Sequence, residues 1–366
     1  MGLAKQSSTK SRIIFLDLIR AFAVLMMVQG HTVHTLLDEA ARSTDFAAYA
    51  VWRFMRGFTA PVFMFTAGTV FAYLFRINGR PFSENPRVKR GLKRFGLLIL
   101  IGYLLRWPTW TFLDFSDVSD LRWKIFFSVD VLHCIGFGVL FIILLAWAAE
   151  KIPRGDFVVF GLAAVGSVAF HIGFEHVAWS ERLHPIFANY LYSGGGSQFP
   201  LFPWLFYMFA GAFLGSYLSG KPDIFKRKRF AFSLLAAGGA LVGLAWIFAQ
   251  IAPMEATDEW TFVTLQTIAQ RIGFVLIFNA VFVVLAFRID KIPRIIILVG
   301  RNTLLIYVVH LIILYGSPWN MGLVHRVGRT LGAWETVGAA AAMIAAMSLL
   351  AYGIHWLKIR NKSLVS

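Results

Sequence analysis

Long apolar runs dominate the sequence, and short polar segments separate them. Each run is about 20 residues long, the length that an α-helix needs to cross the hydrocarbon core of a bilayer. Apolar and polar residues do not alternate along the runs, as they would in the strands of a membrane β-barrel. The pattern predicts an all-α, polytopic integral membrane protein with about ten transmembrane helices. The predicted spans cover residues 13–36, 50–75, 95–112, 126–149, 157–174, 201–219, 231–250, 263–287, 295–316 and 334–356.

Composition supports a membrane protein and gives no sign of a separate soluble domain. The 366 residues are 58% hydrophobic and 15% charged, whereas soluble domains carry about 25% charged residues. The whole chain, 1–366, is therefore predicted to form one transmembrane domain. Its helical bundle covers 13–356, with short tails at 1–12 and 357–366.

The net charge of +16 is distributed unevenly between the polar segments. Basic residues gather in alternate segments, such as RINGRPFSENPRVKRGLKR, FKRKR and RIDKIPR. Segments on the other side of the predicted membrane are acidic, as in LDEAARSTD and LDFSDVSD. By the positive-inside rule, this asymmetry predicts that both termini are cytoplasmic. The basic clusters are expected to contact anionic membrane lipids, and no nucleic-acid partner is expected.

Several ionisable residues fall inside the predicted spans. Each costs roughly 2.5–3.5 kcal/mol on insertion, so such residues usually mark a functional interior. In the first span, Arg20 and His31 are eleven residues apart and share one face at 100° per residue, with Asp17 within about 60° of Arg20. The helical rise separates Arg20 from His31 by roughly 16 Å. One polar stripe is thus predicted to face the bundle interior and to reach from the cytoplasmic half toward the outer half.

The fourth and ninth spans carry further candidates. Asp130 and His133 have the i, i+3 spacing at which a carboxylate can orient an imidazole, at about the depth of His31. Together with His31 they would form a general base. In the ninth span, Tyr307 and His310 share a face.

Other interpretations of these residues remain open at this point. Asp17 and Arg20 could simply neutralise each other near the interface, and His31 could be a hydrogen-bonded core residue. Arg301 and His310 lie on opposite sides of their helix and need not serve one site. No metal is expected, because the histidines lack the compact spacing of zinc ligands. The single cysteine, Cys134, excludes an internal disulfide.

Several segments together resemble a known family. RIIFLDLIRAFAVLMMVQGH, with ten residues between Arg20 and His31, resembles the Arg-x10-His signature of the membrane-bound acyltransferase-3 family. RFMRGFTAPVFMFTAGTVFAYLFR is similar to the second helix of that family. FFSVDVLHCIGFGVLF, LFPWLFYMFAGAFLGSYL and LVGRNTLLIYVVH resemble the related branch that includes heparan-α-glucosaminide N-acetyltransferase and its bacterial relatives. The similarity covers most of the chain in the same order.

The resemblance implies an acyltransferase of the bacterial inner membrane. It would move an acyl group, commonly acetyl, from cytoplasmic acyl-CoA to a hydroxyl or amine of a carbohydrate or cell-envelope glycan on the opposite side. Arg20 and His31 carry over as the signature pair, with His31 handling the acyl group. The human-type enzyme has Asn at the signature-His position and its catalytic His further along the outer loop, but here that loop contains no His. Whether a covalent acyl-histidine forms therefore stays open.

The sequence thus predicts three groups of site residues. The catalytic candidates are His31, Arg20, Asp130 and His133; the residues expected to bind the acyl-CoA (acetyl-CoA) donor are Arg20, Arg106, Arg271 and Arg301; those expected to bind the acceptor are His34, Arg56, Tyr307 and His310. The expected partners are membrane lipids, acyl-CoA and a carbohydrate acceptor, with a homodimer as one option for assembly. A transporter of lipid-linked sugars or small solutes, and a non-enzymatic membrane partner, are the alternative functions.

Overall fold

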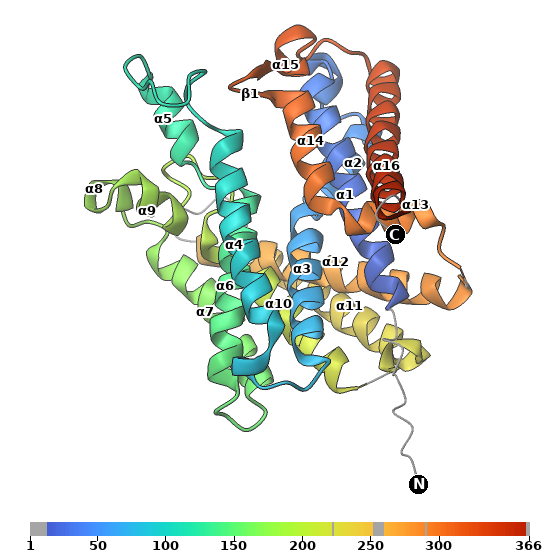
Figure 1. Ribbon diagram of the computed structural model, residues 1–366. Helices are drawn as coiled ribbons and strands as arrows, with labels where there is room; N and C mark the ends of the chain where they lie inside the picture. Colours follow the sequence, from blue (N-terminus) through green and yellow to red (C-terminus); the bar gives the residue numbers. More distant parts are fainter. Residues whose placement is uncertain (1–12, 222, 252–259, 290, 364–366) are drawn as a thin grey trace.

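The computed structural model describes residues 13–221, 223–251, 260–289 and 291–363, and nearly all regular structure there is helical (Figure 1). The tail predicted over 1–12 lies outside the described residues. The helices are α1 (Ile14–Leu36), α2 (Ala47–Arg56), α3 (Thr59–Arg76), α4 (Pro86–Leu105), α5 (Asp120–Phe127), α6 (Val131–Ala149), α7 (Gly155–Phe174), α8 (Trp179–Arg182), α9 (Pro185–Leu191), α10 (Leu201–Gly220), α11 (Lys228–Ile251), α12 (Trp260–Arg288), α13 (Arg294–Arg301), α14 (Thr303–Tyr315), α15 (Leu323–Arg326) and α16 (Ala333–Ser363). Three 3-10 turns, η1 (Glu39–Arg42), η2 (Phe82–Glu84) and η3 (Ile224–Lys226), and one hairpin, β1 (Gly316–Ser317) with β2 (Asn320–Met321), complete the described structure.

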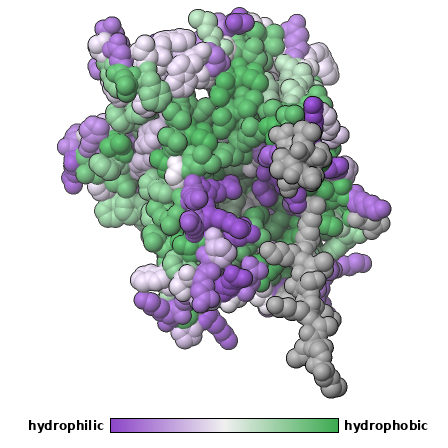
Figure 2. All heavy atoms as spheres, in the orientation of Figure 1, coloured by the Kyte–Doolittle hydropathy of each residue, from purple (hydrophilic) through white to green (hydrophobic). Residues whose placement is uncertain are grey.

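The long helices confirm an all-helical, polytopic membrane protein. In the described part of the chain, eight helical segments are long and apolar enough to span a bilayer, and the bent pair α13–α14 would be a ninth. The remaining predicted span falls on α4, whose first half is basic (PRVKRGLKR) and whose apolar part is therefore short. Figure 2 shows hydrophobic side chains over much of the upper and central part of one face, as contact with hydrocarbon requires.

Three of the predicted continuous spans contain a break in the backbone helix. The second is interrupted at Gly57 and Phe58 between α2 and α3, and the fourth at residues 128–130 between α5 and α6. The ninth bends by 77° at Asn302 between α13 and α14. Hydropathy does not register such breaks, because the residues on both sides remain apolar. The break between α5 and α6 brings the polar residues Ser128 and Asp130 to the interior, where both are buried.

Close backbone approaches hold the bundle together. α3 packs along α10, where a Cβ added at Gly68 would lie 2.1 Å from the carbonyl oxygen of Met208, and one at Gly211 would lie 2.0 Å from that of Phe65. Small residues allow this contact between membrane helices. α1 packs against α3 and α12 on one side and against α13, α14 and α16 on the other (Figure 1). α1 therefore joins the two parts of the bundle.

Candidate functional site

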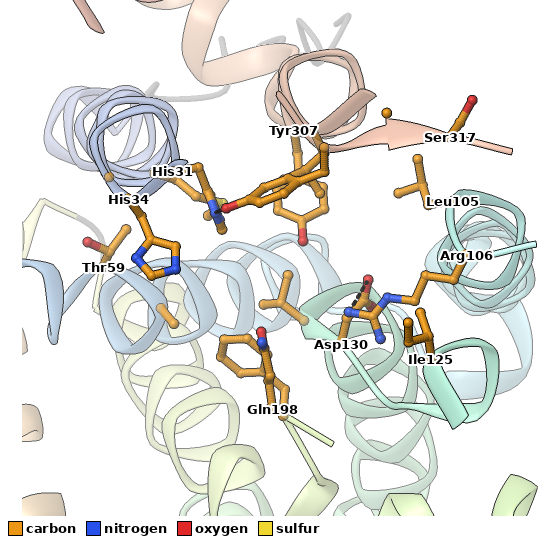
Figure 3. A pocket seen from close by; sticks show the side chains of 18 of the residues that line it. His31, His34, Thr59, Leu105, Arg106, Ile125, Asp130, Gln198, Tyr307 and Ser317 are labelled. Atoms are coloured by element: carbon orange, nitrogen blue, oxygen red, sulfur yellow. Dashed lines mark hydrogen bonds and ion pairs between the residues drawn. The ribbon is translucent and has the colours of Figure 1, made fainter. Parts of the chain in front are cut away.

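A cavity of about 1,020 Å³ lies beside the C-terminal half of α1. Its walls come from α1, the break between α2 and α3, the segment joining α4 to α5, the start of α6, and from α10, α12, α14 and the β1–β2 hairpin. Seven residues predicted from the sequence line it: His31, His34, Arg56, Arg106, Asp130, Arg271 and Tyr307. In Figure 3, His31 and Tyr307 lie on one wall, and Asp130 and Arg106 lie on the facing wall.

His31 is held by a tyrosine that the sequence analysis did not identify. Its Nδ1 lies 3.0 Å from the hydroxyl oxygen of Tyr315 at the end of α14. The side chain of Thr35 lies next to the same hydroxyl. Thr35 donates its own proton to the backbone carbonyl of His31, at 2.8 Å. Nothing in the spacing of the sequence points to Tyr315, because it meets His31 only through the packing of α14 on α1.

The contact with Tyr315 is compatible with either tautomer of His31, because a hydroxyl can donate or accept. In the tautomer protonated at Nδ1, the Tyr315 oxygen accepts the hydrogen bond from Nδ1–H. That tautomer leaves Nε2 with the lone pair that a base or nucleophile needs.

His310 lies behind His31 and does not line the cavity. The two imidazole rings are 5.4 Å apart, centre to centre, and Tyr307 packs edge-on against His310 at 5.6 Å. Nδ1 of His310 donates to the carbonyl of Ile306 at 2.8 Å. His310 therefore supports the ring of His31. Among the described residues, no three His, Cys, Asp or Glu side chains are grouped as metal ligands.

Asp130 lies on the cavity wall that faces His31, and it is the N-cap residue of α6. Its Oδ1 accepts hydrogen bonds from the backbone N–H of Leu132 at 2.9 Å and of His133 at 3.2 Å. The backbone N–H of Asp130 donates to Nδ1 of His133 at 3.3 Å, which completes a capping box, and the same Nδ1 lies 2.9 Å from Oδ1. Oδ2 of Asp130 forms an ion pair with Arg106 at 3.8 Å. The carboxylate thus fixes both the start of α6 and the Arg106 guanidinium.

His133 is sealed from the cavity. Its ring is 0% exposed and packs against Tyr103, with ring centres 4.5 Å apart. A Cβ at Gly102 would lie 2.5 Å from the imidazole, so only glycine leaves room for this ring. The Tyr103 hydroxyl in turn meets that of Tyr190 at 3.1 Å, and burial together with this contact raises the pKa of Tyr190 in α9. His133 therefore acts on the cavity only through Asp130.

Arg20 and Arg301 lie in a different cluster, away from the cavity lining. Arg20 is within electrostatic reach of Arg94 on α4, of Asp17 and of Arg301. Gly300 allows α13 to approach α1 at this level, since a Cβ there would lie 2.9 Å from the backbone oxygen of Asp17. The polar stripe predicted along α1 is thus divided between two environments.

An ion pair closes the loop that follows α1. Glu39 accepts a hydrogen bond from Arg329, which lowers the pKa of the Glu39 carboxyl. Backbone hydrogen bonds join the same segments, from Asp38 to Leu331 at 2.9 Å and from Leu331 to Leu36 at 3.0 Å. These contacts fix the C-terminal end of α1 against the segment between α15 and α16.

Comparison with known families identifies the chain. The family model described as heparan-alpha-glucosaminide N-acetyltransferase, catalytic, matches residues 12–250. Among curated proteins there is no significant match. The matched segment carries His31, Arg106 and Asp130, whereas Arg271 and Tyr315 lie beyond it, on α12 and α14. Because the match covers well over half of the sequence, the protein belongs to the family of heparan-α-glucosaminide N-acetyltransferase catalytic domains.

Proposed function

We propose that the protein transfers an acetyl group from an acyl-CoA donor to a hydroxyl or amine of a carbohydrate acceptor. The observation that carries this proposal is the His31 imidazole, which lines a cavity large enough for a ligand and whose Nδ1 contacts the Tyr315 hydroxyl, so that Nε2 is the ring nitrogen available to a ligand. Membership of the family favours a transferase that acts on glycans. The positive-inside pattern favours cytoplasmic termini, with the cavity on the opposite side. The resemblance to bacterial relatives of the family favours a bacterial inner membrane.

In the proposed reaction, His31 serves as general base. Its Nε2 removes the proton from the acceptor hydroxyl or amine, whose oxygen or nitrogen attacks the thioester carbonyl carbon. The carbonyl electron pair moves onto oxygen and forms a tetrahedral intermediate. Collapse of the intermediate breaks the C–S bond, and the proton held by His31 passes to the leaving thiolate. The products are the acetylated acceptor and free CoA.

Positive charge in the cavity would stabilise the oxyanion of this intermediate. Arg106 is the candidate, because its position is fixed: Nη1 donates to the backbone carbonyl of Ser128 at 2.7 Å, and Nη2 pairs with Asp130. A fixed donor aimed at developing charge needs no reorganisation during the reaction. A covalent acyl-histidine would use the same free Nε2 of His31, and mass spectrometry of rapidly quenched protein would detect it.

The donor would bind at the other end of α1. CoA is a polyanion, and Arg20, Arg94 and Arg301 form a cationic cluster near Asp17. The basic segment 76–94 would raise the local concentration of CoA at this side. The pantetheine arm would then run along α1 toward His31, roughly 16 Å away along the helix axis.

The proposal is tested with purified protein in proteoliposomes. We expect radiolabel from acetyl-CoA to appear in a glycan acceptor, with release of one CoA thiol for each acetyl group transferred. Acceptor-independent thiol release measures hydrolysis and serves as the blank. Uptake of solute without any acetyl transfer would instead favour the transporter.

A further inference from the structure

The cavity has an excess of positive charge. Five arginines line it, and they come from four separate elements: Arg53, Arg56, Arg106, Arg122 and Arg271. The lining residues include one carboxylate, that of Asp130, among those that the structure describes. A catalytic pocket for a neutral sugar has no need of this many cations.

Four of these arginines have no acidic partner. Asp130 is paired with Arg106, and no carboxylate of the described residues lies within 4.0 Å of the other four. Arg271 lies over the ring of Trp204 at 5.4 Å, and Arg122 donates to the carbonyl of Pro108 at 3.2 Å. Neutral partners thus orient the guanidinium groups without compensating their charge. Uncompensated cations in a cavity attract an anionic ligand. Each guanidinium can also donate two parallel hydrogen bonds to the oxygens of a phosphate group.

The mouth of the same cavity is apolar. Two of its lining residues, Trp110 and Met321, are 55% and 66% exposed. Trp319 joins the two sides of this mouth, because its indole N–H donates to the Trp110 carbonyl at 3.1 Å and its ring stacks with Phe112. The adjacent Leu113 is 82% exposed. Figure 1 shows the segment before α5 and the β1–β2 hairpin at the same end of the bundle.

Exposed aromatic and aliphatic side chains of this kind are stable at the interface between hydrocarbon and headgroups. The mouth therefore lies at the membrane surface. Of the lining arginines, Arg56, Arg106 and Arg271 are half-buried in the cavity, while Arg53 and Arg122 are exposed. A ligand that satisfies both regions has a charged head and a hydrocarbon tail.

We propose that the acceptor is a membrane-anchored phosphoglycan, whose phosphate binds the cavity arginines while its lipid chain stays in the bilayer against the apolar mouth. This inference rests on the proposed function, since it names the class of acceptor for the same site. Arg53 and Arg56 on α2 and Arg122 on α5 would bind the phosphate and thereby present the sugar to His31. The volume of about 1,020 Å³ accommodates such a headgroup.

The test measures binding and does not depend on acyl transfer. Wild-type protein in nanodiscs is titrated with decaprenyl phosphate and with two control ligands, the uncharged decaprenol and the water-soluble glucose 1-phosphate. We expect decaprenyl phosphate to bind at least about tenfold more tightly than either control, because decaprenol lacks the phosphate and glucose 1-phosphate lacks the lipid chain. Equal binding of decaprenyl phosphate and decaprenol, or of decaprenyl phosphate and glucose 1-phosphate, would overturn the proposal.

Variants then assign the binding to the arginines. The double variant Arg56→Gln with Arg122→Gln should weaken decaprenyl phosphate binding at least about tenfold and leave decaprenol binding unchanged. The matched control is Arg182→Gln, an exposed arginine on α8 that does not line the cavity. Acetyl-CoA affinity should be the same in all three proteins. If the double variant instead loses acetyl-CoA binding, the arginines bind the donor and the proposal is wrong. Failure of the transferase assay itself would leave these binding results intact, so the two proposals fail separately.

Discussion

The two ends of α1 carry similar polar residues but place them in different surroundings. At one end, Arg20 is close to Asp17, Arg94 and Arg301, and α13 packs tightly against the helix at Gly300. At the other end, His31 lines the cavity and is bound by the neutral hydroxyl of Tyr315. The first environment is suited to hold a fixed anion, and the second to accept and return a proton. In the proposed reaction, the two ends of this helical stripe would serve donor binding and proton transfer separately, roughly 16 Å apart.

The largest expected effect comes from removing His31, the proposed general base. We expect His31→Ala to lower the rate of acetyl transfer by roughly 10²- to 10⁴-fold, the usual contribution of general acid–base catalysis. His34→Ala is the matched variant, one helical turn further along the same cavity wall, and should lower the rate by less than about tenfold because it removes a contact and not the base. Equal losses in the two variants, measured with radiolabelled acetyl-CoA, would show that α1 contributes no specific base.

Substitutions of Asp130, on the facing wall of the cavity, should mainly lower the stability of the protein. Asp130→Ala removes the cap of α6 and leaves Arg106 without its carboxylate, so we expect the free energy of unfolding in detergent to fall by about 3 kcal/mol. Asp130→Asn keeps a capping oxygen and removes only the charge, so its loss should be smaller. Denaturant unfolding of the two variants checks this order. If both variants were as stable as the wild type, the capping box and the ion pair would have no structural role.

A smaller effect should follow from removing the Tyr315 hydroxyl that contacts Nδ1 of His31. Tyr315→Phe removes the oxygen that accepts from Nδ1–H, and we expect kcat to fall by about three- to tenfold with KM for acetyl-CoA unchanged. The pH profile of kcat should change as well, which a purely structural role would not produce. Thr35→Val should act in the same direction through Tyr315. Additive losses in the double variant, in place of a shared loss, would contradict a single hydrogen-bonded chain.

The smallest effect is expected at Glu39, an exposed residue just after the C-terminal end of α1. The pKa of Glu39 is lowered by its hydrogen bond with Arg329. Its contribution to stability is therefore fully present above the ordinary glutamate pKa of about 4.3, and is lost as the pH falls through the lowered value. Glu39→Gln should remove this pH dependence and change the melting temperature only slightly at pH 7. A large loss at pH 7 would mean that the ion pair holds α1 in place.

The sequence was sufficient for the helical class and for contacts within one helix. The i, i+3 spacing of Asp130 and His133 and the shared face of Tyr307 and His310 both correspond to contacts in the structure. Contacts between helices were not predictable, because periodicity gives the face of a helix but not its neighbour. Tyr315 and Arg122 reach the cavity only through such packing. The bend at Asn302 was not predictable either, because an apolar run does not indicate where its helix breaks.

The most direct test of the division along α1 is the equilibrium binding of acetyl-CoA to two folded variants, Arg20→Gln and His31→Ala. We expect Arg20→Gln to weaken binding by about tenfold, because a charge-assisted hydrogen bond is lost, and His31→Ala to bind acetyl-CoA like the wild type. The opposite order, or equal affinities in both variants, would contradict separate roles for the two ends of the helix.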